Sequence, residues 1–394
     1  MRELRSGWTL TRVGDLFDMQ IGKKLNKEAS TGLEQHEYVT NKDVQWNRVH
    51  FKKLNRMNFN AAERERFRLI PGDLLVTEGG EVGRTAIWEG QRTDCYFQMS
   101  LHRLRTRGAI EPRYMLHYMA YAARHGLFVD GVSQTSIAHL PQDKFAEHLV
   151  AHPVELGEQR RIVEVIETLS EQERAIEASI EKLKATKSGA SDGLLDGFAW
   201  DCTLADAADG AIRNGFSPVE SEEWTGVRML GLGCLTPSGF EPVQLKNAPS
   251  SVTASHSALL RDGDLLMSRA NTRELVGLAG VYRQVGVPCI YPDLMMRVRP
   301  PKVYSAEFLA AVLMSTRTRR YVRSMAQGTS ESMVKISATT VRGIPVPLPG
   351  REEQARVLAA LASLSRQVNA ETEELAKLRS LKRGLVDDLF AWAA

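Results

Sequence analysis

The chain has 394 residues, of which 43% are hydrophobic and 25% are charged, and its formal net charge is +3. This length is typical of two or three domains with ordinary cores. The N-terminus lacks the apolar run of a signal peptide, and no stretch approaches the roughly 18 apolar residues that span a bilayer, so we expect a cytoplasmic protein. The cysteines form no CxxC pair, which argues against a zinc ribbon or a disulfide framework and favours reduced thiols at Cys95, Cys202, Cys234 and Cys289.

We predict a first mixed domain over residues 1–154. It starts with a short segment, Trp8–Phe17, and continues with several strands joined by Gly-rich turns. A helix over Pro112–Arg124 and a polar stretch, Gly131–Ser136, lead to a last strand at His148–Val154. Strands combined with one long helix indicate a compact α/β (α+β) unit.

A long helix follows over residues 155–197. Its apolar residues recur at steps of four and three, with two polar interruptions, at Ile162, Ile166, Leu169, Glu173, Ile176, Ile180, Leu183 and Lys187. Heptads sustained over more than four repeats indicate a coiled-coil seam rather than the face of a globular helix. The same steps continue to Ala190 and Leu194, so at about 1.5 Å per residue the 33 residues from Ile162 to Leu194 span roughly 50 Å.

The second half of the chain repeats the first. Gly72-Asp73-Leu74-Leu75 returns 191 positions later, whereas Ile87-Trp88 returns as Val281-Tyr282 after 194. Three residues are therefore inserted within Ser268–Leu275, which we interpret as an adjustable reading loop, with a neutral surface insertion as the alternative. We predict a second mixed domain over 198–349, with one helix over Ala306–Val322, and a C-terminal helix over 350–394.

The C-terminal helix carries the same seam, displaced by 195 positions, at Val357, Leu361, Leu364, Val368, Glu371, Leu375, Leu378 and Lys382. Parallel pairing would bury Lys187 against Lys382. Antiparallel pairing instead sets Lys187 opposite Glu371 and Glu173 within about a layer of Lys382, and such buried polar pairs can fix direction. We therefore predict an intramolecular antiparallel coiled coil that relates the two domains by a pseudo-twofold axis.

Local charge points to a polyanionic partner. Residues 48–68 hold seven Lys/Arg against two Glu, and residues 261–335 hold twelve Lys/Arg against six Asp/Glu. Basic surfaces on a nearly neutral chain fit nucleic acid, although ordinary solvated faces would give similar counts.

The expected DNA contacts are Lys, Arg, Asn, Gln, Ser and Thr side chains near loops, because these groups bind phosphates and base edges. Glu78, in the loop that holds Thr77 and Arg84, is included. In the first domain the candidates are Lys23, Lys24, Asn41, Lys42, Gln45, Thr77, Glu78, Arg84, Ser133, Gln134, Thr135 and Ser136. In the second they are Arg213, Asn214, Ser268, Arg269, Asn271, Thr272, Arg273, Gln327, Thr329, Ser330, Ser332 and Lys335.

Motifs for chemistry are missing from the sequence. It has no GxxxxGK[ST] for ATP, no Asn/Asp-Pro-Pro-Tyr or GxGxxG of an amino-methyltransferase, and no nuclease carboxylate–lysine set. His148 and His152 have a metal-like spacing, but in a strand they would lie far apart, so we expect no metal site. We predict a chain without catalytic residues, whose partners supply the chemistry.

The chain resembles the specificity subunits of Type I restriction–modification systems (HsdS) over nearly its whole length. The resemblance rests on the opening Trp8, Val13, Asp15 and Leu16, on the repeated GDLL strand and on the helix starts GEQRRIVEVIETL (157–169) and REEQARVLAALASL (351–364). The helices close with GLLDGF (193–198) and GLVDDLF (384–390).

The family implies a non-catalytic, DNA-binding subunit whose two target-recognition domains each read half of a bipartite, asymmetric site. Its helices would set the gap between the half-sites and dock two methyltransferase subunits, which use S-adenosylmethionine to methylate adenine. Motor-nuclease subunits, which use ATP and Mg²⁺, would join that core. This chain itself would bind no cofactor.

Two other functions fit part of the pattern. A coiled-coil scaffold with protein-binding domains would explain the heptads but not the basic loops. A solo DNA-binding regulator would explain the loops, and copurification with a methyltransferase subunit distinguishes it from a specificity subunit.

Overall fold

The computed structural model describes residues 4–128, 139–208, 212–253, 255–301, 303–328 and 333–391. The chain forms two compact units. Unit 1 comprises Met1–Ile176 and Glu374–Ala394, and unit 2 comprises Glu177–Glu373. Each unit holds one mixed domain with segments of both long helices. None of the described helices is long and apolar enough to cross a membrane.

Unit 1 is built on a four-stranded antiparallel sheet in the order β2-β10-β7-β8. Its strands are β2 (Phe17–Ile21), β10 (Leu101–Thr106), β7 (Leu74–Thr77) and β8 (Thr85–Ile87). A three-stranded sheet, β6-β3-β9, pairs β3 with β9 in parallel. The strands of that sheet are β6 (Asn55–Asn58), β3 (Gln35–Val39) and β9 (Cys95–Phe97). The unit also has two two-stranded pairs, β1 (Trp8–Arg12) with β11 (Leu149–Pro153) and β4 (Val44–Gln45) with β5 (Arg48–Val49).

Unit 2 repeats this topology with the sheet orders β13-β22-β18-β20 and β17-β14-β21. The strands are β13 (Ile212–Asn214), β22 (Met295–Val298), β18 (Leu265–Ser268), β20 (Ala279–Val281), β17 (Leu245–Asn247), β14 (Arg228–Leu230) and β21 (Cys289–Ile290). Three two-stranded pairs complete the unit: β12 (Cys202–Thr203) with β24 (Pro345–Val346), β15 (Leu235–Thr236) with β16 (Gly239–Phe240), and β19 (Ala270–Asn271) with β23 (Val334–Lys335). The duplication read from the sequence is therefore a duplication of strand order.

The repeated GDLL motif has a physical reason at each position. Its glycine adopts a left-handed φ of +92° at Gly72 and +85° at Gly263, which disfavours other residues. Its aspartate accepts two hydrogen bonds from one arginine, Arg105 to Asp73 at 2.8 Å each and Arg299 to Asp264 at 2.5 and 2.8 Å. These charge-assisted pairs hold the turn that leads into the strand.

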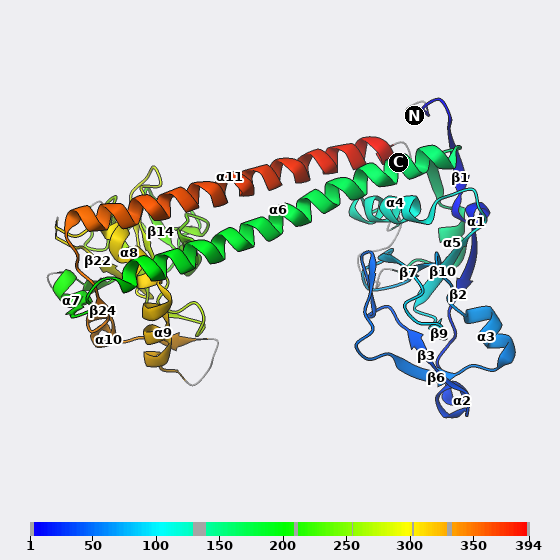
Figure 1. Ribbon diagram of the computed structural model, residues 1–394, viewed down its shortest axis with the longest axis horizontal. Helices are drawn as coiled ribbons and strands as arrows, with labels where there is room; N and C mark the ends of the chain where they lie inside the picture. The colour runs from blue at the N-terminus through cyan, green and yellow to red at the C-terminus, as the bar shows by residue number, and fades with distance from the viewer. Residues whose placement is uncertain are drawn as a thin grey trace. The chain divides into compact units, whose positions relative to one another are not determined.

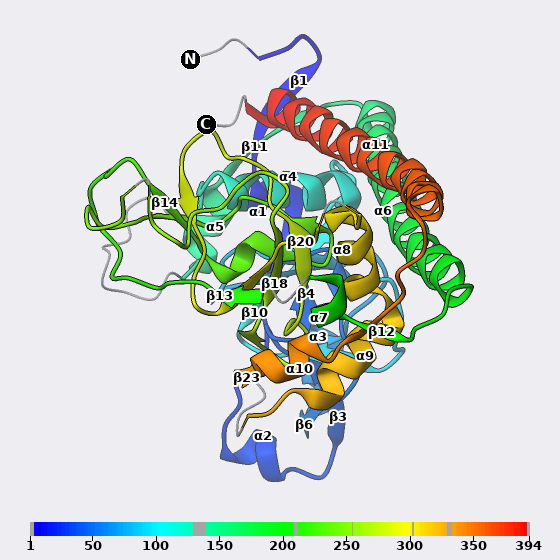
Figure 2. The same ribbon diagram turned by 90° about the vertical axis from the view of Figure 1, so that its left-hand side faces the viewer.

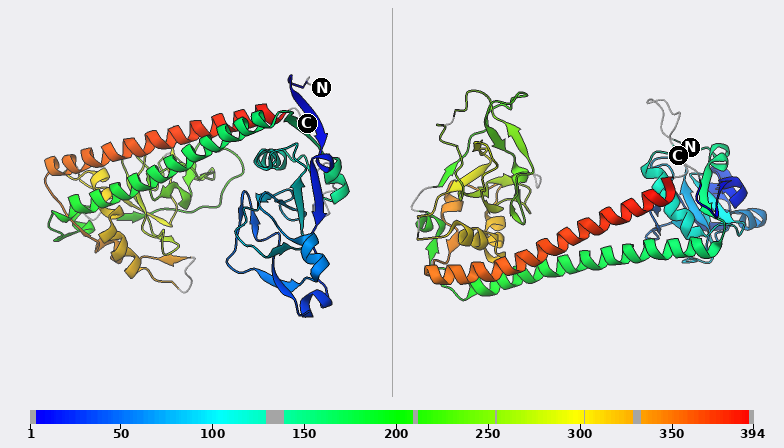
Figure 3. Two further views of the ribbon diagram at one scale, coloured as in Figure 1. Left: turned by 45° about the vertical axis from the view of Figure 1, so that its right-hand side comes forward. Right: turned by 90° about the horizontal axis from the view of Figure 1, so that it is seen from above.

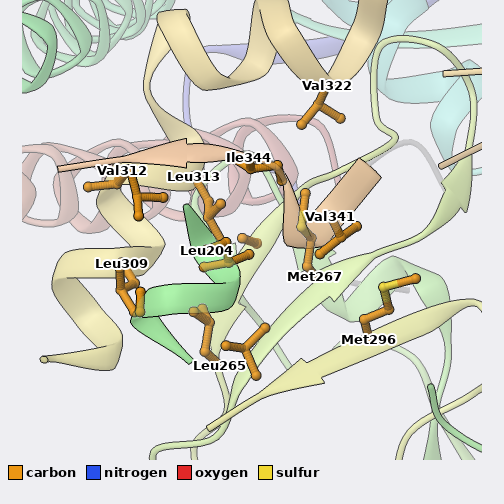
Figure 4. Packing of buried hydrophobic residues seen from close by; sticks show 14 of the residues in the cluster. Leu204, Leu265, Met267, Met296, Leu309, Val312, Leu313, Val322, Val341 and Ile344 are labelled. Carbon is orange, nitrogen blue, oxygen red and sulfur yellow. The ribbon is translucent and has the colours of Figure 1, made fainter. Parts of the chain in front are cut away.

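The two leucines of GDLL point into different cores, because alternate residues of a strand face opposite sides of a sheet. In unit 2, Leu265 and Met267 pack with helices in one cluster, whereas Leu266 belongs to the cluster beneath the three-stranded sheet. Figure 4 shows the first cluster, in which Leu309 and Leu313 lie near the strand. Unit 1 has the same division, with Leu74 and Val76 on one side and Leu75 on the other.

The shorter helices of unit 1 are α1 (Val13–Leu16), α2 (Lys27–Thr31), α3 (Ala61–Phe67), α4 (Pro112–Arg124) and α5 (Gln142–Glu147). Those of unit 2 are α7 (Leu204–Ala207), the 3₁₀ turn η1 (Leu232–Cys234), α8 (Ala306–Met314), α9 (Thr316–Met325) and α10 (Ala338–Arg342). In Figure 2, α8 lies beside β18 and β20, which it contacts.

The prediction of one helix over Ala306–Val322 was wrong. Two helices, α8 and α9, are separated by Ser315, whose backbone is extended with φ −61° and ψ 152°. The Ser315 hydroxyl donates to Val312 O at 2.7 Å and accepts from Thr318 N at 3.4 Å, so one serine ends the first helix and caps the second.

The long helices are α6 (Leu156–Asp196) and α11 (Arg351–Phe390). Each starts with a buried glutamine that binds the mixed domain before it. Gln159 accepts from Glu111 N at 2.8 Å and donates to Pro153 O at 2.8 Å. Gln354 accepts from Ser305 N at 2.9 Å and donates to Pro349 O at 2.9 Å. The glutamine of the repeated EQ therefore joins the first turn of each long helix to the mixed domain before it by hydrogen bonds.

In each unit a segment of α6 lies beside a segment of α11, and the two run in opposite directions (Figures 1 and 3). In unit 1, Lys382 Nζ donates to Glu173 at 3.1 Å, as the predicted antiparallel pairing requires. In unit 2, Ser179 Oγ donates to Glu371 at 3.0 Å. Every residue of the predicted seam is buried or half-buried.

The predicted partnership of Lys187 with Glu371 was wrong. Glu371 meets Ser179, about two helical turns earlier along α6, and Lys187 has no hydrogen bond or ion pair within the described parts of the chain. Burial lowers the pKa of Lys187, which stays half-buried in the seam. The observed register brings Lys382 to Glu173 and Glu371 to Ser179.

Candidate nucleic-acid interface

A buried hydroxyl closes the loop at the end of the central strand in both domains. Thr77 Oγ1 donates to Glu81 O at 2.5 Å and accepts from Arg84 N at 3.1 Å. Ser268 Oγ donates to Leu275 O at 3.2 Å and accepts from Gly277 N at 3.1 Å. Both hydroxyl residues are fully buried and shape the loop, which argues against the predicted contact of these two side chains with DNA.

This shared closure locates the insertion more finely than the sequence does. In the first domain three residues, 78–80, lie between Thr77 and Glu81, and in the second domain six, 269–274, lie between Ser268 and Leu275. We call these segments loop A (78–80) and loop B (269–274). The three additional residues therefore belong to loop B.

Loop A is surrounded by several predicted contact residues. Arg84 pairs with Glu81 at 3.1 Å and donates to Asn41 O at 2.8 Å, so its guanidinium is engaged within the domain. Glu78 is half-buried. Lys42 is exposed, with no side-chain partner among the described residues, and Gln45 donates weakly to Lys42 O at 3.4 Å.

Lys23 and Lys24 follow β2 and differ in their availability. Lys23 forms an ion pair with Glu63 at 2.5 Å and donates to Asn58 O at 2.7 Å, so its ammonium group serves the fold. Lys24 is exposed. Both line a cleft of about 550 Å³ together with Asn26, Asn60 and Arg66. Lys24 is the member of the pair that is free to meet a phosphate.

Loop B contains the strand β19, which pairs with β23 in an antiparallel ladder. Ala270 lies opposite Lys335 and Asn271 opposite Val334, and Gln327 pairs with Lys335 in turn. The structure thus brings together predicted residues from two distant segments. Gln327 and Lys335 are exposed, whereas Arg269, Asn271 and Thr272 are half-buried.

Within loop B the polar side chains are partly engaged. Asn271 Oδ1 accepts from Thr272 N at 2.8 Å, and Arg273 donates to Arg323 O at 3.3 Å and Ala326 O at 3.4 Å. The Nε of Arg269 is buried without a hydrogen-bond partner.

Arg213 and Asn214 lie on β13 and are exposed. The register sets Asn214 opposite Met296, which is itself opposite Met267, the residue before Ser268. Asn214 therefore lies at the same end of the sheet as loop B. Seven of the predicted contacts are outside the described residues: Ser133, Gln134, Thr135, Ser136, Thr329, Ser330 and Ser332.

The described residues hold no group of three or more His, Cys, Asp or Glu side chains that could bind a metal. His148 hydrogen-bonds Tyr118 at 2.7 Å, and His152 hydrogen-bonds Thr11 at 3.0 Å, so the two histidines have separate partners. Burial raises the pKa of the Cys95 and Cys289 thiols to about 12, which leaves them protonated and unreactive.

Two sets of residues were missed in the sequence. The Asp–Arg pairs of the GDLL turn could have been found from the repeated Arg103-Leu-Arg105 and Arg297-Val-Arg299, which recur with the same 194-residue spacing. The arginines of α9 that contact loop B had no signal in the repeat, because no matching basic helix occurs among the described residues of the first domain.

Comparisons with known proteins agree on one family. The model of the Type I restriction modification DNA specificity domain matches residues 5–185. The EcoKI specificity subunit of Escherichia coli K12 is 22% identical, and the match covers 98% of this chain and 89% of that protein.

Two solved structures are similar over almost the whole chain. One, from a study of assembly and conformational transition of the type I R-M system, has a TM-score of 0.66 at 20% identity and covers 98% of both chains. The HsdS subunit of Thermoanaerobacter tengcongensis has a TM-score of 0.53 at 19% identity and covers 99% of this chain and 98% of that one. These structures share the fold described above.

Proposed function

We propose that this chain is a specificity subunit of a Type I restriction–modification system and that its two mixed domains each read one half of a bipartite DNA site. The match of residues 5–185 to the specificity-domain model and the 22% identical EcoKI subunit support this assignment. As a specificity subunit it is itself non-catalytic and directs the modification and restriction activities of its partners. The two half-sites differ, so the complete site is asymmetric.

The observation that carries the proposal is the unequal pair of loops on one repeated scaffold. Loops A and B leave equivalent strands and are closed by equivalent hydroxyls, yet loop B is three residues longer and has a different sequence. Packed strands tolerate little change, whereas loops accept insertions and carry recognition. Two copies of one scaffold with different loops suit the reading of two different sequences.

The exposed side chains near the loops have the chemistry that DNA requires. Lys24, Lys42 and Lys335 offer ammonium groups for phosphates, and Asn214 and Gln327 offer amides that match base edges. Arg269, Asn271, Thr272 and Arg273 stay in the proposed interface as the content of loop B, while Thr77 and Ser268 do not.

We further propose that the paired helices set the distance between the half-sites and dock two methyltransferase subunits. Those subunits would bind S-adenosylmethionine and methylate adenine, and motor-nuclease subunits would bring ATP and Mg²⁺. The division into domains at 1–154 and 198–349, with helical spacers at 155–197 and 350–394, remains part of this proposal.

The test is to express the chain with its methyltransferase partner in a host without other adenine methylation and to map methylated adenines across the genome. We expect one motif with two specified halves and a constant gap. A strain that lacks this chain but keeps the methyltransferase subunit should show no motif. Methylation that does not depend on the chain, or a single uninterrupted motif, would contradict the proposal.

A further inference from the structure

Arginine side chains of α9 donate hydrogen bonds to the backbone at the C-terminal end of loop B. Arg319 donates from Nη1 to Val276 O at 2.5 Å and from Nη2 to Glu274 O at 2.6 Å. Arg323 donates to Glu274 O at 3.2 Å, and Arg273 of loop B donates back to Arg323 O at 3.3 Å. The C-terminal side of the inserted loop is therefore connected to one helix in both directions.

Arg319 is a costly residue to place there. Only 7% of it is exposed, and it forms no ion pair with a carboxylate among the residues that the structure describes. Burial, with the nearby Arg323, lowers its pKa to about 10, so the guanidinium remains charged at neutral pH. A buried charge costs free energy unless it is hydrogen-bonded, and here two backbone carbonyls satisfy it.

The first domain handles the same position differently. A side chain at Gly83 would meet the ring of Phe128, whereas one at the equivalent Gly277 would meet Val322 and Arg319. Across the described part of the first domain, no arginine donates to a carbonyl of loop A. The hydrogen bonds from Arg319 and Arg323 are therefore found beside the longer of the two loops.

We propose that Arg319, assisted by Arg323, is a positioning residue for base recognition by the second domain. It fixes the backbone of residues 274–276, and with it the conformation in which loop B presents Arg269 and Asn271 beside Lys335. A longer loop has more conformations to lose on binding, and restricting them before binding improves both affinity and selectivity. This inference rests on the proposed function, because it assumes that the second domain reads DNA.

The experiment compares variants in complex with the methyltransferase partner, using duplexes with single-base changes in either half of the mapped motif. Arg319→Lys keeps the charge but cannot donate to both carbonyls in the same geometry. We expect it to lose about five- to hundredfold of the discrimination against wrong bases in the second half-site, with discrimination in the first half-site unchanged. Arg319→Met should lose at least as much.

Arg320→Met is the matched control, since Arg320 lies on the same helix, is exposed and forms no hydrogen bond or ion pair with the residues of loop B. It should keep the base preference at both half-sites. If Arg319→Met does not accumulate as folded protein, the base preferences of Arg319→Lys and Arg323→Met test the proposal instead. Arg323 is exposed and donates one hydrogen bond to Glu274 O, so its replacement should leave the fold intact.

Three results would overturn the role of Arg319. The Arg319 variants could fold with unchanged base preference, they could lose base preference equally in both half-sites, or Arg320→Met could show the same loss. Absence of any bipartite motif with the unchanged chain would instead reject the proposed function itself.

Discussion

Gln159 shows how one side chain can fasten a domain to a helix. Its amide satisfies Glu111 N and Pro153 O and is fully buried. Replacing it with Leu leaves Glu111 N without its partner and removes one of the two contacts of Pro153 O, which also meets His152 Nδ1 at 2.9 Å. An unpaired buried backbone group costs about 1–3 kcal/mol. We expect Gln159→Leu to lower the free energy of unfolding by about that amount or more, measured by urea denaturation. Gln172→Leu, at an exposed position of the same helix, should change it by less than about 0.5 kcal/mol.

Lys335 is an exposed cation beside loop B. If its ammonium group meets a phosphate, Lys335→Gln should weaken binding to all DNA sequences alike and reduce the slope of log affinity against log salt by about 0.9. Fluorescence anisotropy over a range of salt concentrations measures this slope. Lys182→Gln removes an equal charge from an exposed face of α6 and serves as the control. An unchanged slope for Lys335→Gln would remove this residue from the interface.

At the scale of elements, the Glu173–Lys382 pair specifies how α6 and α11 meet within unit 1. Both side chains are mostly shielded, with exposed fractions of 17% and 24%. Lys382→Glu sets two carboxylates together and should destabilise the chain, and Glu173→Lys in the same chain should recover about 0.5–1 kcal/mol or more of that loss. A double-mutant cycle by denaturation at pH 8, where His117 is neutral, measures the coupling. Additive effects would show that the pair does not contribute to the register.

His117 lies on α4 near Glu167 of α6, 4.0 Å away, and near Lys382 of α11. Burial, with the positive charges of Lys382 and Arg113, lowers its pKa to about 4. The unfolded chain, with a pKa near 6.5, binds the proton more tightly, so stability should fall as the pH drops from about 6.5 to about 4. The loss should reach roughly 2–3 kcal/mol. His117→Gln should flatten this dependence, and His50→Gln, at an exposed position, should not.

Much of the element structure could be predicted from the sequence, because repetition and periodicity are local signals. The helix at Pro112–Arg124, the repeated GDLL strand and the long helices follow from spacing, and the antiparallel direction follows from the expected pairing of Glu173 with Lys382. The break at Ser315 could not, because its cap depends on one hydroxyl between two good helical segments. The pairing of Lys187 failed for a related reason: polar residues suggest a direction, but apolar layers decide which turn faces which.

The candidate site was less predictable. Residue type identified hydroxyls, amides and cations near the loops, yet burial turned Thr77 and Ser268 into scaffold residues and an ion pair occupied Lys23. The grouping of loop B with Gln327 and Lys335 depends on a strand pairing across more than sixty residues, which no local pattern reveals. The role of Arg319 could not be predicted either, because its hydrogen bonds join residues 43 and 45 positions apart in the sequence.

For the whole molecule, we propose that two copies of one scaffold read different half-sites because their loops differ. In the proposed function the two copies address opposite strands of a duplex, which has a twofold backbone symmetry. The identity of each half-site should then travel with its domain, whereas the gap should stay with the helices.

Replacing residues 198–349 with a second copy of residues 1–154, while keeping both long helices, tests this claim most directly. Methylated adenines are then mapped in cells that also express the methyltransferase partner. We predict a motif made of two inverted copies of the first half-site, separated by the original gap. A motif that still contains the second half-site, or two copies in the same orientation, would contradict the account.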